Sequence, residues 1–172
     1  MTRPIRVGLV SDTHGLLRPE ALMALDGSDF IVHAGDIGDA AILARLAKIA
    51  PVTAVRGNND IGGWANGIPG TQRLDVGGKR IFVIHDLAAI AIDPMAERLD
   101  VVVSGHSHRP KCERRGDVLY VNPGSAGPRR FRLPIAVGVL TIEGADVDAE
   151  LVMLDDAVAR ATRPAAVASI SR

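Results

Sequence analysis

The stretch FIVHAGDIGDAAILARLAKIAPVTAVRGN, residues 30–58, has the pattern of a strand, a helix and a second strand. Residues 30–35 form an apolar run that is short enough for a buried strand. Residues 39–50 place apolar side chains at helical spacing, and Asp39 stands where the helix N-cap belongs. A second apolar run follows at 52–57. Strands joined through a helix pair in parallel, so this unit predicts a parallel sheet.

The flanking sequence first extends this pattern and then changes it. Before the unit, residues 5–11 are typical of a strand, and residues 19–26 of a short helix that begins with proline. After the unit, residues 71–85 predict a hairpin that turns at Gly77-Gly78. A short helix is predicted at 93–100. Further predicted strands, joined by tight polar turns, lie within 101–106, 111–122, 136–144 and 146–154. The added antiparallel strands favour an α/β sandwich of two mixed sheets flanked by helices over a simple doubly wound sheet.

Length and composition predict one domain with an aliphatic core. The chain has 172 residues, of which 47% are hydrophobic and only 3% aromatic. We assign the domain to residues 1–154. From 155 to 172 the chain is rich in Ala, Arg and Ser with weak periodicity, and we expect a C-terminal helix or a mobile tail there.

Charge and cysteine content limit the partners and the compartment. Twenty basic and twenty acidic residues cancel, which argues against a broad electrostatic attraction to nucleic acid or to an anionic membrane. The single cysteine, Cys112, excludes an intrachain disulfide and suits a reducing compartment. The opening residues lack the apolar stretch of a signal peptide, and no segment reaches the roughly 18 apolar residues that span a bilayer. We therefore expect a cytoplasmic protein that does not enter the membrane.

Polar side chains follow five successive apolar runs, at the point where each predicted strand ends. Because ligands bind beyond the carboxyl ends of the strands in open α/β sheets, we expect these side chains to meet. Each one alone has an ordinary explanation as a helix cap, a turn or a buried hydrogen-bonded imidazole. Their joint occurrence favours a metal site. The residues are Asp12, Thr13 and His14; Asp36; Asn58, Asn59 and Asp60; His85 and Asp86; and His106, Ser107 and His108.

The ordered series SDTHG, GDIGD, GNND, IH and GHSH resembles the calcineurin-like metallophosphoesterase superfamily. The chain length and the later stretch VNPGSAGPRR resemble its small single-domain phosphodiesterase branch. The similarity extends from about Arg6 to about Leu154. It implies a two-sheet αββα fold and a pair of adjacent divalent metal ions.

The resemblance also implies which residues hold the ions. Seven side chains would be the metal-binding and catalytic residues: Asp12, His14 and His108 at one ion, Asn58, His85 and His106 at the other, and Asp36 as the bridge. Oxygen and nitrogen ligands without thiolate suit Mn²⁺, Fe²⁺, Zn²⁺ or Ni²⁺ more than Ca²⁺, and the habit of the family puts Mn²⁺ first. Alternate residues of an extended stretch can point different ways, so one HxH can serve both metals of a pair, and His106 and His108 are expected to serve different ions.

Two positions depart from the family pattern. Many larger members have His after the Asn of the third motif, where it can protonate the leaving group or bind phosphate. Here the position is Asn59, and a neutral amide cannot act as a general acid. Good leaving groups should then be favoured, unless water supplies the proton. Asp86 stands where Gly is common, and it either orients His85 or faces solvent.

Two further features have open interpretations. His33 lies inside an apolar strand, so we expect a packed, hydrogen-bonded residue, with support of the metal site as the alternative. The stretch NPGS at 122–125 is either a plain turn or, by the resemblance, a loop near the metals. In the second case its backbone amides and Arg129 or Arg130 would meet a phosphate.

The expected function is that of a metal-dependent phosphodiesterase acting on a small phosphate ester. One alternative is a non-catalytic scaffold, because the retromer subunit related to vacuolar sorting has this fold, an incomplete ligand set and a role in protein contacts. Here all seven ligand positions carry metal-competent side chains, which favours catalysis. A nuclease would use the same metals, but zero net charge and few aromatic residues argue against nucleic acid. The sequence leaves homo-oligomer formation open.

Overall fold

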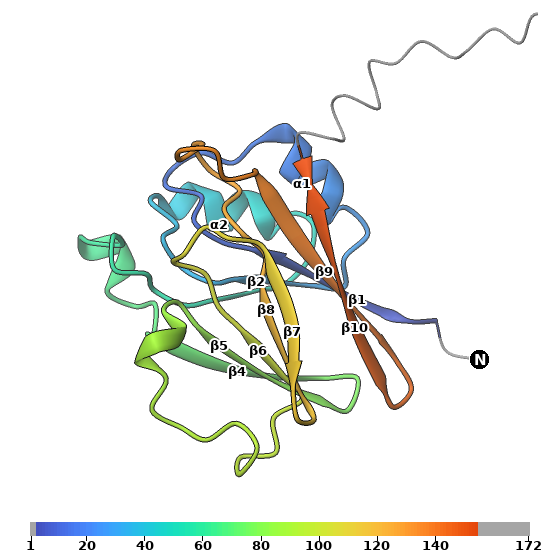
Figure 1. Ribbon diagram of the computed structural model, residues 1–172. Helices are drawn as coiled ribbons and strands as arrows, with labels where there is room; N and C mark the ends of the chain where they lie inside the picture. The colour runs from blue at the N-terminus through green and yellow to red at the C-terminus, as the bar shows by residue number, and fades with distance from the viewer. Residues whose placement is uncertain (1–2, 155–172) are drawn as a thin grey trace, which may run out of the picture.

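The computed structural model describes residues 3–154, in which two five-stranded sheets pack face to face (Figure 1). The strand order is β10-β9-β1-β2-β3 in the first sheet and β4-β5-β6-β8-β7 in the second. This confirms the predicted two-sheet α/β sandwich, while the predicted helix or tail at 155–172 lies outside the described residues. The elements are β1 (Ile5–Val10), α1 (Pro19–Leu25), β2 (Phe30–His33), α2 (Ala40–Leu46), β3 (Val52–Ala54), the 3₁₀ turn η1 (Gly63–Ala65), β4 (Thr71–Val76), β5 (Lys79–Ile84), the 3₁₀ turn η2 (Leu87–Ala89), β6 (Val101–Val103), β7 (Lys111–Arg115), β8 (Val118–Asn122), β9 (Ala136–Glu143) and β10 (Asp146–Met153).

Parallel pairing occupies part of each sheet, and hairpins complete it. In the first sheet β1 pairs with β2 and β2 with β3 in parallel, as the strand–helix–strand pattern predicts. In the second sheet β5, β6 and β8 are parallel. The hairpins β9–β10, β4–β5 and β7–β8 are antiparallel, and the β4–β5 turn falls at the predicted Gly77-Gly78. Parallel strands therefore direct several carboxyl ends toward a common edge.

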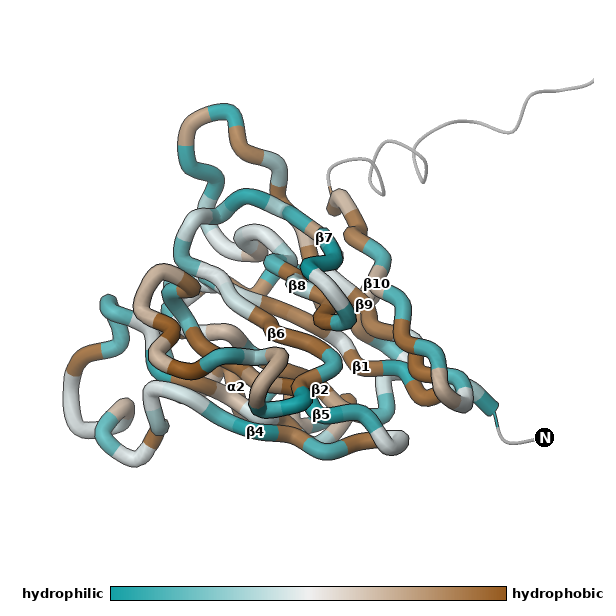
Figure 2. The backbone as a smooth tube through the Cα atoms, turned by 60° about the horizontal axis from the view of Figure 1, so that its bottom comes forward, coloured by the Kyte–Doolittle hydropathy of each residue, from teal (hydrophilic) through white to brown (hydrophobic). Residues whose placement is uncertain are grey.

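The main core lies between the two sheets and is aliphatic. In β1, Val7 and Leu9 belong to this inner core, while Val10 packs in the layer beneath the helices. Helices α1 and α2 cover the outer face of the first sheet (Figure 1). Helix α1 packs closely against β1, since a Cβ added to Gly8 would lie 2.7 Å from Cδ2 of Leu25. Figure 2 shows β6, which reads Val-Val-Val, in the hydrophobic colour at the centre of the molecule.

The outer face of the second sheet is covered by irregular chain, and the prediction of a helix at 93–100 is wrong. The side chain of Asp93 accepts hydrogen bonds from the backbone of Met95 and Ala96, as a helix cap would. Arg98 then adopts φ +53°, which ends the turn before a helix can propagate. The apolar residues that close this face are Phe82, Ile84, Leu99, Val102 and Val118, with Leu87, Ile90, Ile92 and Tyr120 packed against them.

Two other elements are shorter than predicted. Helix α2 ends at Leu46 instead of residue 50, although its N-cap is confirmed by the Asp39 carboxylate, which accepts from the Ala41 N–H at 2.8 Å. Strand β3 ends at Ala54 because the next segment leaves the sheet. The Arg56 N–H donates to the Pro69 carbonyl at 2.8 Å instead of to β2. Among the described helices, none has the length and apolar character needed to cross a membrane.

Candidate metal centre

The loops that follow the parallel strands meet at one end of the sandwich. The loops after β1 and β2 are joined where the Asp12 N–H donates to the Gly35 carbonyl at 3.0 Å. Loops of the second sheet are joined in the same way, since the Gly105 N–H donates to the His85 carbonyl at 2.9 Å. All seven predicted site residues lie in these converging loops: Asp12, His14, Asp36, Asn58, His85, His106 and His108.

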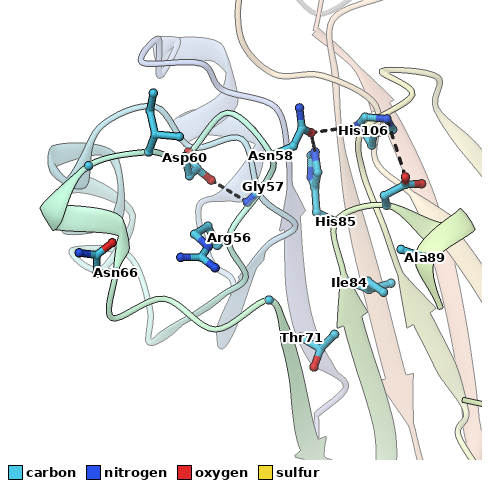
Figure 3. A pocket seen from close by; sticks show the side chains of 14 residues that line it. Arg56, Gly57, Asn58, Asp60, Asn66, Thr71, Ile84, His85, Ala89 and His106 are labelled. Carbon is cyan, nitrogen blue, oxygen red and sulfur yellow. Dashed lines mark hydrogen bonds and ion pairs between the residues drawn. The ribbon is translucent and has the colours of Figure 1, made fainter. Parts of the chain in front are cut away.

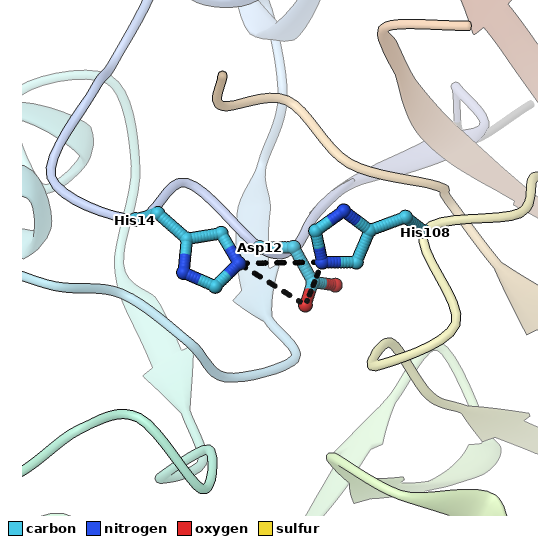
Figure 4. Close-up of side chains that lie close together, drawn as sticks. All are labelled: Asp12, His14 and His108. Carbon is cyan, nitrogen blue, oxygen red and sulfur yellow. Dashed lines mark hydrogen bonds and ion pairs between the residues drawn. The ribbon is translucent and has the colours of Figure 1, made fainter. Parts of the chain in front are cut away.

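Asp12, His14 and His108 form a compact group, here called the inner triad (Figure 4). Their ligand atoms all lie within 4.8 Å of one another. The Nε2 atoms of His14 and His108 are 3.2 Å apart, and Asp12 Oδ1 is 3.2 Å from His108 Nε2. Asp12 is fully buried, and His108 is only 5% exposed. The inner triad is therefore a shielded set with one carboxylate and two imidazoles.

Asn58, His85 and His106 form a second group, the outer triad (Figure 3). The Oδ1 atom of Asn58 is 3.1 Å from His85 Nε2 and 3.1 Å from His106 Nδ1. His85 is buried, but Asn58 and His106 are exposed. All three residues line a cleft of about 810 Å³. The outer triad thus faces open space, unlike the inner one.

Asp36 lies between the triads. Its Oδ2 atom is 3.7 Å from His14 Nε2 and 3.4 Å from His85 Nε2. Asn59 holds the same carboxylate, since its side-chain amide donates to Oδ2 at 2.7 Å and its backbone N–H donates to Oδ1 at 2.9 Å. Burial opposes ionisation, but the hydrogen bonds from His85 and Asn59 outweigh it and hold the pKa of Asp36 well below its usual range. The residue is a carboxylate at neutral pH.

The ring orientation of His85 exposes a lone pair to the site. Its Nδ1 lies 2.7 Å from the Ala34 carbonyl, so Nδ1 carries the proton and donates it there. Nε2 can donate to Asp36 Oδ2 or Asn58 Oδ1 only when the ring is protonated, and in the neutral ring its lone pair faces both of these acceptor oxygens. Burial lowers the pKa of His85, but the hydrogen bonds with Asp36 and Ala34 outweigh this and raise it. The positive partner that these atoms need is a proton or a metal cation.

Within residues 3–154, Asp12 also has an acceptor oxygen that lacks a hydrogen-bond donor. Its Oδ2 accepts from the Ser11 hydroxyl at 2.6 Å and from the His106 N–H at 3.1 Å. Its Oδ1 is buried and has no hydrogen-bond partner among the described residues. A buried carboxylate oxygen without a donor is unfavourable unless a cation compensates it. The orphaned oxygen, which faces the imidazoles of the inner triad, fits a divalent metal ion.

The backbone of the site is strained. The left-handed region is adopted by five of the seven residues, namely Asp12 (φ 53°), His14 (45°), Asp36 (53°), His106 (66°) and His108 (58°). Each such conformation costs on the order of 1–3 kcal/mol and persists only where the surroundings impose it. The expectation that 106–108 is extended is wrong for this reason. His106 and His108 do lie in different triads, but this depends on the tight loop, because an extended strand would direct residues i and i+2 to the same face.

Close packing of the loops explains two glycines. A Cβ on Gly57 would collide with the backbone N and Oδ1 of Asp36, and one on Gly105 would collide with the Ser11 hydroxyl. The first contact involves the site residue Asp36 itself, and the second involves the hydroxyl that donates to Asp12. Any larger residue at these positions would push the loops apart.

His33 is confirmed as a packed, hydrogen-bonded residue, and it also supports the inner triad. Its Nδ1 accepts from the Gly35 N–H at 3.2 Å, so the proton lies on Nε2, which donates to the Thr13 hydroxyl at 2.9 Å. That hydroxyl donates to the Ile37 carbonyl at 2.8 Å. Complete burial lowers the pKa of His33 to about 3. The ring is therefore neutral and fixes the backbone between Asp12 and His14.

Within residues 3–154, no hydrogen bond or ion pair joins the Asp86 carboxylate to the His85 ring. Its carboxylate caps η2 by accepting from the Ala88 N–H at 2.9 Å, and its other oxygen lies 4.0 Å from His106 Nε2. Its side chain is 43% exposed. Neither interpretation from the sequence was complete, because Asp86 is a partly exposed turn residue at the rim of the outer triad.

The stretch 122–125 does lie at the site. The Ser125 hydroxyl donates to the Asp12 carbonyl at 2.9 Å, so this loop packs on the inner triad. Burial lowers the pKa of His14, the carboxylates of Asp36 and Asp12 oppose this, and the nearby positive charge of Arg130 lowers it further. The charge of Arg130 therefore acts on His14 in the inner triad.

Asp60 and Asn122, to which the sequence assigned no specific contact, hold the loops of the site. The Asp60 carboxylate accepts from the Gly57 N–H at 2.8 Å and from the Gly38 N–H at 2.9 Å. The Asn122 amide donates to the Gly105 carbonyl at 2.7 Å. Both residues were visible in the motifs GNND and NPGS, but their turn-forming character concealed these long-range contacts.

The comparisons with known proteins agree with this geometry. A model of the calcineurin-like phosphoesterase superfamily domain matches residues 5–145. The chain belongs to this superfamily. A probable metallophosphoesterase of Methanothermobacter thermautotrophicus is 32% identical over 166 residues, which cover 90% of this chain and 95% of that protein. Phosphodiesterase YfcE of Escherichia coli K12 is 30% identical over 160 residues, covering 79% of this chain and 87% of YfcE.

The same fold also occurs in Vps29, whose name, unlike those of the two relatives above, does not describe a phosphoesterase. The crystal structure of Vps29 from Entamoeba histolytica, solved in complex with Zn²⁺, matches with a TM-score of 0.70 and 20% identity. The match covers 87% of this chain and 99% of that one. At this identity the likeness shows the fold alone.

Proposed function

We propose that this protein is a phosphodiesterase that uses two divalent metal ions, one bound by the inner triad and one by the outer triad, with Asp36 as the bridge. The observation that carries the proposal is the convergence of acceptor atoms without donors. Asp12 Oδ1 is buried and unpartnered, and His85 Nε2 faces two oxygens. Superfamily membership and the names of the relatives support the same chemistry.

Each metal position receives groups that are already oriented. The Ala34 carbonyl fixes the ring of His85, Asn59 holds both oxygens of Asp36, and Ser11 holds Oδ2 of Asp12. Such supporting contacts commonly tune metal affinity by about 10–100-fold. Two cations bound here would supply charge neutralisation for a phosphoryl group and a hydroxide nucleophile at neutral pH. Among the metals that fit oxygen and nitrogen ligands we propose Mn²⁺ first, with Zn²⁺, Fe²⁺ or Ni²⁺ as alternatives.

The substrate is proposed to be a small phosphate diester with a good leaving group. Asn59 cannot act as a general acid, and its amide is already engaged with Asp36. Arg130, whose charge reaches His14, is proposed to attract the phosphate from the side of the inner triad. We favour catalysis over the scaffold role because all seven ligand positions converge. A cytoplasmic location stays a prediction, and homo-oligomer formation stays open.

The experiment is a rate comparison on purified, metal-stripped protein with Mn²⁺ added back. We expect hydrolysis of bis(p-nitrophenyl) phosphate that EDTA abolishes, and rates for a series of aryl methyl phosphates that fall steeply as the leaving-group pKa rises. Asn59→His should flatten this dependence by supplying an acid. Hydrolysis that survives EDTA would contradict the metal mechanism, and a flat wild-type series would contradict the missing acid.

A further inference from the structure

The cleft beside the outer triad extends well beyond the proposed metal ligands. Figure 3 shows Arg56 and Asn66 on one side of it and Ile84, His85 and Ala89 on the other. Its volume of about 810 Å³ far exceeds the space that a phosphoryl group needs. It is lined by Asn58, His85 and His106, but by no member of the inner triad. The cleft is therefore placed to hold whatever projects from the outer side of a bound phosphate.

Arg56 gives this cleft a distinct charge. The side chain is exposed, and it makes no ion pair or side-chain hydrogen bond within residues 3–154. Arg56 stands two residues before the proposed ligand Asn58. Its backbone N–H donates to the Pro69 carbonyl at 2.8 Å, which fixes the backbone at this position. Among the lining residues in the described part of the chain, it is the one lysine or arginine. The backbone of Arg56 is therefore held in place, while its guanidinium is exposed and can bind a ligand.

The two carboxylates that line the cleft do not neutralise Arg56. Asp60 is 4% exposed, and both its oxygens accept backbone N–H groups. Asp86 caps η2 and approaches His106. Apart from His85 and His106, the rest of the described lining has no ionisable side chain, and it includes Ile61, which is 79% exposed. An open guanidinium beside a largely uncharged wall is suited to an anion carried on an organic group.

We infer that this cleft is a specificity subsite, in which Arg56 pairs with a second anionic group, a carboxylate or phosphate, on the substrate moiety beyond the scissile phosphate. The inference rests on the proposed function, because the scissile phosphate is placed at the metal ligands. A guanidinium binds either group through two parallel hydrogen bonds. Asn66 and Thr71, which also line the cleft, supply neutral polar groups for the connecting part of the substrate.

The test uses matched p-nitrophenyl diesters whose second alcohol is either 3-hydroxypropionate or neutral propanol. In the wild type the anionic diester should have the lower KM. Arg56→Gln should raise KM for the anionic diester about 10-fold, as expected for loss of one charge-assisted pair, and change KM for the neutral one less than about twofold. Arg56→Lys should retain part of the preference, and Arg80→Gln, at an exposed arginine that does not line the cleft, should retain all of it.

A second readout separates the subsite from the proposed catalysis. The same pair is prepared as non-hydrolysable phosphonate analogues, and their binding to the Mn²⁺-treated protein is measured by calorimetry. An Arg56-dependent preference for the anionic analogue without turnover of either diester would overturn the proposed function and leave the subsite standing. If both diesters are hydrolysed and Arg56→Gln changes KM equally for the two, the subsite is overturned. Arg56 would then contact the scissile phosphate, which both diesters share, or would not contact the substrate at all.

Discussion

The inner and outer triads contain similar ligands in opposite surroundings. The inner triad has the buried carboxylate of Asp12 and the nearly buried ring of His108. In the outer triad the oxygen ligand is the neutral amide of Asn58, and both Asn58 and His106 are exposed. A buried charged set binds a cation more tightly and exchanges it more slowly than an exposed neutral one. Under the proposed function, this difference predicts a resident ion in the inner triad and a more exchangeable ion in the outer triad, next to the cleft.

The hydrogen bonds that hold the two triads in place also differ between a buried and a more exposed setting. Beneath the inner triad, neutral His33 and Thr13 form a closed hydrogen-bond chain that ends at a backbone carbonyl. The outer triad depends on the loop after β3, which Asp60 holds through two backbone N–H groups, and on His106 at the surface. Three experiments with substituted proteins probe this difference, in order of decreasing expected effect.

Asp36→Asn should have the largest effect because it weakens both triads at once. Loss of the bridging charge should remove most bound metal and lower turnover by at least about 100-fold, the upper end of what outer-shell substitutions cost. Metal per chain and kcat measured on the same sample check this. The control is Asp39→Asn, which alters only the cap of α2 at a cost of about 1 kcal/mol or less. Equal metal loss in the two variants would remove the bridging role.

His108→Ala and His106→Ala should differ. His108→Ala removes a buried ligand of the inner triad, and we expect both the tight ion and the activity to be lost. His106→Ala removes an exposed ligand of the outer triad, and we expect one tightly held ion to remain although activity falls. Elemental analysis after dialysis and circular dichroism of each variant test metal content and folding separately. Identical metal content in the two folded variants would contradict the unequal triads.

His33→Gln tests the support of the inner triad through pH. The folded-state pKa of His33, about 3, lies below the ordinary value of 6.5, so the unfolded chain binds the proton more readily. Stability is therefore full above pH 6.5 and is lost as pH falls toward 3, by up to about 1.4 kcal/mol per pH unit. Urea unfolding of metal-free protein should show this slope in the wild type. The variant, in which Gln cannot titrate, should show a shallower one, whereas parallel curves would contradict the assignment.

The site was predictable because it depends on chain order. Parallel strands bring their carboxyl ends together, so the polar residues after β1, β2 and β3 are neighbours in one sheet, and those after β5 and β6 are neighbours in the other. The family motifs then separated the residues into two sets. The structure reproduces that division, with His108 beside Asp12 and His106 beside Asn58, while the metal-binding roles themselves stay predictions.

What could not be predicted depends on contacts distant in sequence. The left-handed backbone of His106 and His108 is imposed by packing against the first sheet, including the bond from the His106 N–H to Asp12. The segment 93–100 has the start of a helix but ends at Arg98. Asn122 is a turn residue by local sequence and a support of the loop at 105–107 by tertiary contact. Local patterns do not contain these contacts.

The most direct test is a calorimetric titration of metal-stripped wild-type protein with Mn²⁺, accompanied by thermal melts at each stoichiometry. Two unequal triads predict two ions per chain bound in two resolved steps. The first and tighter step should give most of the rise in melting temperature, because an ion that binds only the folded state stabilises it by mass action. His106→Ala should keep the first step and lose the second. Binding of a single ion, or two equal steps, would contradict the division into triads. No binding, with a melting temperature unmoved by millimolar Mn²⁺, would contradict the metal centre itself.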